Sequence, residues 1–210
     1  MTALAVTVFG AVALGIVQAS FVEWAFHRYW LHRPWLPKGC FTSHTLVHHQ
    51  LCKFGDTFEI VEEEQHESLT FKWWGGPLLI LIILSPWLCL AWWSAAIGWA
   101  LPRLPFLIAL GVTTSLYYAG YEGLHHLMHM PRFPWVERAR WFQFLKKHHR
   151  IHHIKMNRNL NVLVPIADFF LGTLVTTMPG EVPTPASARA LARRHSNRRK
   201  QDEIGEELAS

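Results

Sequence analysis

The chain has 210 residues, of which 50% are hydrophobic and 11 are Trp; its mean hydropathy is +0.12 and its net charge is +5. This length and composition indicate one membrane-embedded domain, and they argue against a nucleic-acid-binding role for the basic residues. The three cysteines form no C-x-x-C pair, which fits a reducing compartment and gives no support to a disulfide framework or a thiolate metal site.

The first predicted element is residues 2–22, a run without charge. As a helix rising about 1.5 Å per residue, it is long enough to cross a hydrocarbon core of roughly 30 Å. It has no basic segment before it and no small-residue cleavage site, so we expect a retained membrane span rather than a removed signal peptide. His27 and His32 follow, five positions apart, which is about 140° around an ideal α-helix. They can converge only if the span frays at this end, which Pro34 favours.

The second histidine group is HTLVHH, with His44, His48 and His49. Residues three or four apart share a helix face, so His44 and His48 can present ring nitrogens to a common point. Asp56 and Glu59 come shortly afterwards. A carboxylate can orient a ligand imidazole by accepting a hydrogen bond from its second ring nitrogen. A solvated or helix-capping role is the alternative for both acids.

Two more charge-free runs, residues 75–101 and 104–121, are each about long enough to span a membrane. Ser85 and Pro86 interrupt the first of them. We favour one kinked span there; the alternative is a tight hairpin, which would give four transmembrane helices instead of three. With three spans, all histidine groups lie on one side of the membrane, together with every Lys and Arg except Arg103. This excess of positive charge predicts that the histidine side is cytoplasmic.

The last span leads into two further histidine groups. They are HHLMH, with His125, His126 and His129, and HHRIHH, with His148, His149, His152 and His153. Members three or four positions apart, such as His149 with His152 and His153, share a helix face. Glu122 and Asp168 are additional candidates to orient imidazoles, with solvation or helix capping again as the alternative.

The four groups hold 12 of the 14 histidines; His66 and His195 stand alone and are interpreted as solvated or structural. A neutral imidazole offers one nitrogen to a metal while the other donates to a nearby acceptor. Even ten of these clustered imidazoles would exceed what one tetrahedral zinc uses. We therefore predict two metal ions with open positions for chemistry. Imidazole suits zinc, copper, nickel and iron alike, so the spacing does not select the metal.

The end of the chain differs in composition from the rest. A basic run, RALARRHSNRRK, precedes an acidic one, QDEIGEELAS. We therefore divide the chain into a membrane-embedded domain, residues 1–180, and a charged cytoplasmic tail, residues 181–210, that rests on anionic lipid or is solvated.

The histidine motifs, placed around membrane spans, resemble those of the fatty acid hydroxylase and sterol desaturase superfamily of integral-membrane di-iron oxygenases. They are HRYWLH (27–32), HTLVHH (44–49), HHLMH (125–129) and HRIHH (149–153). RNLNVLVPIADFFLGT (158–173) is similar to that superfamily's closing motif. The second group departs from the fatty acid 2-hydroxylase pattern by one residue, reading H-x-x-x-H-H, which leaves the role of His44 open. The resemblance implies an all-α fold with about three transmembrane helices and a cytoplasmic, histidine-rich helical cap.

The resemblance also implies a ligand set for two irons. Its members are His27, His32, His44, His48, His49, His125, His129, His149, His152 and His153, with His126 and His148 as alternatives to their neighbours. Asp56, Glu59, Glu122 and Asp168 remain the candidates to orient these ligands.

The implied reaction is O2-dependent hydroxylation of a lipid acyl chain; sterol or carotenoid oxidation and desaturation are the alternatives. No nucleotide-binding fingerprint occurs in the sequence, so we expect electrons from an external carrier, a ferredoxin or b-type cytochrome with its reductase. The basic residues near the last histidine groups could dock it. A histidine-rich metal transporter is the rival class, but the charge-free runs contain no His, Asp or Glu.

Overall fold

A computed structural model describes residues 2–35, 37–53, 57–60, 69, 73–97 and 103–178. These residues form helices and connecting turns, and no β-strand occurs among them. The predictions for Asp56, His66, His195 and the tail 181–210 concern residues outside the described part of the chain.

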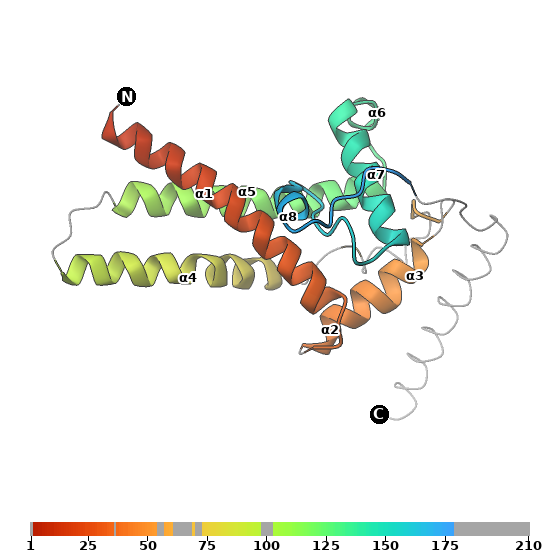
Figure 1. The fold of residues 1–210 in the computed structure, drawn as a ribbon, viewed down its shortest axis with the longest axis horizontal. Coiled ribbons are helices and arrows are strands. Elements are labelled where there is room, and N and C mark those ends of the chain that lie inside the picture. The colour runs from red at the N-terminus through yellow and green to blue at the C-terminus, as the bar shows by residue number, and fades with distance from the viewer. Residues whose placement is uncertain are drawn as a thin grey trace.

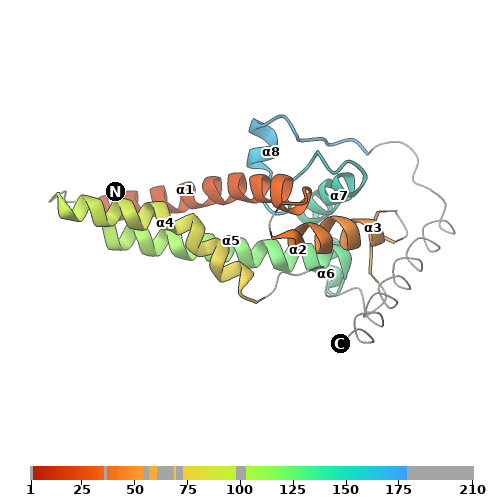
Figure 2. The same ribbon diagram turned by 90° about the horizontal axis from the view of Figure 1, so that it is seen from below.

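Three long helices run side by side and carry the rest of the molecule at one end (Figures 1 and 2). They are α1 (Ala3–Phe26), α4 (Gly75–Ala96) and α5 (Arg103–His129). Each is long and apolar enough to cross a membrane. Large apolar side chains such as Phe9, Trp92 and Leu116 are exposed on their outer faces, as lipid contact requires. The predicted all-α fold with three spans is confirmed.

α4 passes through Ser85 and Pro86 without a break, so the single-span prediction is confirmed and the hairpin alternative is wrong. A proline removes one backbone donor and usually kinks a helix. The Ser85 hydroxyl donates to the carbonyl oxygen of Ile82 at 2.9 Å, a bond of the kind that re-satisfies backbone groups near a proline in a span.

α1 packs closely on α5 and is joined to α4 by polar contacts. Gly15 makes the close approach possible, because a Cβ atom at this position would lie 3.0 Å from Thr113 Cγ2. The Gln18 side chain donates to the carbonyl oxygen of Ile83 and accepts from Trp87 Nε1–H, at 3.0 and 2.7 Å.

Shorter helices form a cap on one end of this bundle. They are α2 (Lys38–Phe41), α3 (His49–Leu51), α6 (Pro134–Glu137), α7 (Arg140–Ile154) and α8 (Ile166–Phe170). The buried rings and aliphatic groups of Phe58, Tyr121, Met128 and Phe142 pack the cap against the end of α5.

Two π-helices, η1 (His27–Leu31) and η2 (Thr42–His48), contain His27, His44 and His48, and His32 and His49 follow directly after them. The expectation that the first span frays after Phe26 was therefore wrong. The chain stays helical with a wider turn, whose i→i+5 hydrogen bonds bring residues five apart onto one side. The rings of His27 and His32 consequently stack with centroids 5.0 Å apart.

Candidate metal centre

Nine histidines converge in two groups at the cap end of the bundle. Within each group, one ring nitrogen of every member lies within 4.8 Å of the others. The first group is His27, His32, His44, His49 and His152, and the second is His48, His129, His149 and His153. All are buried except His32, which is partly buried.

Histidines that are adjacent in the sequence belong to different groups. His48 and His49 separate, and so do His152 and His153. Neighbours on an α-helix point about 100° apart, so one helix can serve two sites. His149 and His153, four apart on α7, meet as their spacing predicts, with Nε2 atoms 3.0 Å apart.

Two of the pairings suggested by α-helical spacing are replaced by others. His44 lies with His49 rather than with His48, because the π-turn of η2 aligns residues five apart. His152 belongs to a different group from His149 and lies with His27 and His32.

In the first group, hydrogen bonds fix which nitrogen of three rings is bare. Nδ1–H of His27 donates to the carbonyl oxygen of Leu160 at 2.6 Å, and Nδ1–H of His152 donates to that of Arg158 at 2.8 Å. The Thr45 hydroxyl donates to the carbonyl oxygen of Leu31, so its oxygen accepts from His32 Nδ1–H at 2.9 Å. A neutral imidazole carries one proton. Nε2 of each of these three histidines is therefore unprotonated and carries a free lone pair.

These lone pairs face one another, and this geometry fits a metal ion. Nε2 of His32 and Nε2 of His152 are 3.0 Å apart, although neither can donate. Nε2 of His49 and of His44 complete the group, 3.1 Å apart. Two nitrogens bound at right angles to one ion at about 2.1 Å are about 3.0 Å apart. A cation between the rings would turn the repulsion of their lone pairs into coordination.

In the second group, His129 is oriented in the same way. Nδ1–H of His129 donates to the carbonyl oxygen of Phe58 at 2.6 Å, and its Nε2 lies 3.0 Å from that of His149. His125 stands beside this group: its Nδ1–H donates to the carbonyl oxygen of Leu69, and its Nε2 is 3.2 Å from Nε2 of His48. His125 is thus placed where a tenth ligand could approach.

Burial keeps these imidazoles neutral. Among those beyond the long helices, it lowers the pKa of His152 to about 4. Burial, followed by repulsion from His152, lowers the pKa of His32 to about 2. For His44, His48, His49, His149 and His153, burial and neighbouring histidines lower the pKa well below its usual value. Neutral rings are the form that binds metals.

The two alternative histidines lie outside both groups. His148 is buried, and its Nε2–H donates to Asp168 Oδ2 at 3.1 Å. His126 is partly buried on the end of α5.

Asp168 organises the segment that supplies two of the orienting carbonyl groups. Its carboxylate accepts from the backbone N–H groups of Leu160 and Asn161 and from the Thr173 hydroxyl. Although burial raises the pKa of Asp168, the hydrogen bonds from His148, Thr173, Asn161 and Leu160 outweigh it, so the pKa lies below its usual value. Asp168 therefore acts on the site through the backbone rather than through a ligand ring.

Two of the other acids bind elsewhere. Glu59 pairs with Lys146 at 2.8 Å, and Glu122 accepts from the Tyr118 hydroxyl at 3.1 Å.

Sequence reasoning missed that backbone carbonyls and Thr45 orient the ligands; only tertiary structure could reveal them. It also missed Glu23, which accepts from Tyr117, Asn161 and Val162 and ties α1 to α5 and the closing motif. Its signal was an acid placed directly after a charge-free run.

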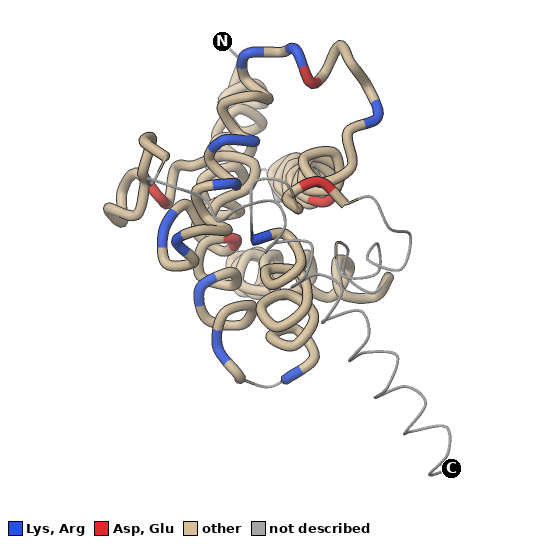
Figure 3. Tube along the Cα trace, turned by 90° about the vertical axis from the view of Figure 1, so that its right-hand side faces the viewer, with Lys and Arg blue, Asp and Glu red and all other residues tan. Residues whose placement is uncertain are grey.

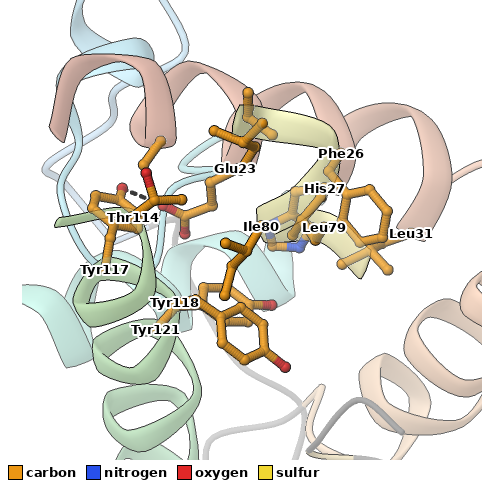
Figure 4. Close-up of a pocket in the computed structure, with 13 residues that line it drawn as sticks. Glu23, Phe26, His27, Leu31, Leu79, Ile80, Thr114, Tyr117, Tyr118 and Tyr121 are labelled. Carbon is orange, nitrogen blue, oxygen red and sulfur yellow. Dashed lines mark hydrogen bonds between the residues drawn. The ribbon is translucent and has the colours of Figure 1, made fainter. Parts of the chain in front are cut away.

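A cavity between α1, α4 and α5 reaches the first histidine group (Figure 4). His27 belongs both to its wall and to that group. Three of its hydroxyl groups are engaged within the protein: Thr114 donates to the carbonyl oxygen of Leu110, Tyr117 to Glu23 and Tyr118 to Glu122. Apolar side chains supply most of the remaining lining, namely Ala19, Val22, Phe26, Leu31, Leu79, Ile80 and Ile83.

The fatty acid hydroxylase family model matches residues 12–173, so the chain belongs to that family. The match contains every member of the two histidine groups and the segment around Asp168. No curated protein and no solved structure matches the chain. Membership makes it an oxidoreductase of the hydroxylase and desaturase type, with a histidine cluster that fits a metal site.

Proposed function

We propose that this protein is a di-iron hydroxylase that uses O2 to oxidise lipid acyl chains at the membrane surface. The observation that carries the proposal is His27, which joins the apolar cavity between the spans to a cluster of inward-facing imidazole lone pairs. Two irons, when bound by the two histidine groups, would supply the O2 activation that attack on an unactivated C–H bond requires. His125 would complete the ligand set beside the second group.

The chain's own residues have three tasks in this proposal. The cavity lining suits an apolar chain, because Glu23 and the hydroxyl groups of Thr114, Tyr117 and Tyr118 are already hydrogen-bonded within the protein. The carbonyl groups of Leu160 and Arg158 hold ligand rings in one orientation. The buried walls exclude water from the reacting position.

Electrons come, in this proposal, from an external ferredoxin or b-type cytochrome with its reductase. Figure 3 looks onto the cap end, where Lys and Arg clearly exceed Asp and Glu in the described chain. Lys146 is held by Glu59 and Glu137, whereas Arg138, Arg140 and Lys147 are exposed. An acidic carrier would dock on these three cations. We place the cap in the cytoplasm because positively charged residues favour the cytoplasmic side of a membrane protein.

The test compares the lipids of cells that express the wild type or His152→Ala under isotopically labelled dioxygen. We expect label in hydroxyacyl lipids with the wild type alone, and about two irons per purified wild-type chain. Label confined to ring-containing lipids would instead indicate sterol or carotenoid oxidation. An unsaturated, unlabelled product would indicate desaturation, and equal labelling by His152→Ala would overturn the proposed site.

A further inference from the structure

The short helix α8 is divided between a buried face and an exposed apolar one. Ala167 and Asp168 have no exposed surface, whereas Phe169, Phe170 and Leu171 are 67, 71 and 45% exposed. Three consecutive large apolar side chains at such exposure are unusual for a surface in water. Something apolar is expected to cover them.

The position of α8 identifies the cover. The Phe170 ring stacks on Phe21 with centroids 6.5 Å apart, and Phe21 belongs to the apolar stretch Ala3–Leu31. At about 1.5 Å per residue, Phe21 lies about 9 Å along the helix before His27. Figures 1 and 2 both place α8 beside α1, between the three-helix bundle and α7. The exposed face of α8 therefore adjoins the apolar helix that is expected to cross the membrane.

The opposite face of α8 is connected to the first histidine group. Asp168 holds the backbone N–H groups of Leu160 and Asn161 at 2.9 and 2.8 Å. The carbonyl oxygen of that same Leu160 orients His27. Arg158, whose carbonyl orients His152, donates from its guanidinium to the carbonyl oxygen of Gly172 at 2.7 Å, one residue beyond the exposed patch.

We propose that α8 is an interfacial anchor that inserts Phe169, Phe170 and Leu171 into the bilayer surface and thereby fixes the carbonyl groups that orient His27 and His152. The bilayer is the natural occupant because the patch is continuous with a helix that already faces lipid. Insertion does not depend on the proposed reaction; the coupling to ligand orientation rests on metal binding by the first histidine group.

The insertion is tested by lipid-phase quenching. Cys40→Ser and Cys89→Ser leave Cys52, which is fully buried, as the remaining native thiol. A bimane label is then attached to Phe170→Cys in full-length protein in nanodiscs that contain brominated phosphatidylcholine. We expect strong quenching there and little at the control Met156→Cys, an exposed apolar position in the same segment. Equal quenching at both sites would overturn the anchor, and so would disulfide crosslinking between two copies through position 170 without quenching by lipid.

The coupling is tested by metal retention rather than by activity. Phe169→Ser/Phe170→Ser and the control Met156→Ser are loaded with iron, reconstituted and exposed to a chelator. We expect the double variant to start with the same iron content and to release it several-fold faster than the wild type, while Met156→Ser behaves as the wild type. Release at the wild-type rate would overturn the coupling. Because neither readout uses turnover, a wrong substrate assignment would leave both results interpretable.

Discussion

Single atoms outside the imidazoles decide which ring nitrogen faces the centre. The carbonyl oxygens of Leu160, Arg158, Phe58 and Leu69 each accept from an Nδ1–H and thereby leave Nε2 bare. Thr45 does the same for His32 through its hydroxyl oxygen. Of these orienting groups, only the Thr45 hydroxyl belongs to a side chain, so it is the one that a substitution can remove.

Thr45→Val should weaken metal binding without removing a ligand. The isosteric side chain keeps the shape but leaves His32 Nδ1–H without its acceptor, and loss of such a partner typically costs about 10- to 100-fold in metal affinity. Iron affinity measured by chelator competition checks this. Thr42→Val, an exposed position in the same π-helix, is the control and should bind iron as the wild type does. Equal affinities for both variants would contradict the role given to Thr45.

At the scale of helices, the contact between α1 and α5 depends on a small residue. Gly15→Val would place new methyl groups into Thr113 and Leu110, whose atoms already lie 3.0 to 3.3 Å from an added Cβ. Overpacking of this kind typically costs about 1–3 kcal/mol. We expect a lower unfolding midpoint in detergent.

Gly10→Val is the matched control, because nothing lies within 4 Å of an added Cβ there. It carries the same change in helix propensity on the same helix. If both variants unfold at the same midpoint, the close approach at Gly15 contributes nothing to stability.

The helices also show how far sequence reasoning reaches. α1, α4 and α5 were predictable because absence of charge over some 20 residues is a local property. The pairing of His44 with His49 was not, since spacing rules assume 3.6 residues per turn and the π-turns break that assumption. The placement of His152 beside His27 and His32 needed the packing of α7, which no local pattern encodes.

At the scale of the whole molecule, the cap and the free end of α1 lie at opposite ends of the bundle (Figure 1). Every Lys and Arg except Arg103 falls on the cap side of the predicted spans. We therefore predict that Lys155→Cys is labelled by an impermeant thiol reagent from the cytoplasm and Thr2→Cys from the opposite side, in a background without Cys40 and Cys89. Labelling of both from one side would refute the topology.

The order of the first histidine group along the chain also determines when that group can be complete. His32 and His152, whose Nε2 atoms meet, are 120 residues apart, with α4 and α5 between them. At about 5–20 residues per second, a ribosome adds His152 about 6 to 24 seconds after His32. During that interval the four earlier members of the group, His27, His32, His44 and His49, exist without His152. The first group is therefore complete only after α4 and α5 have been synthesised.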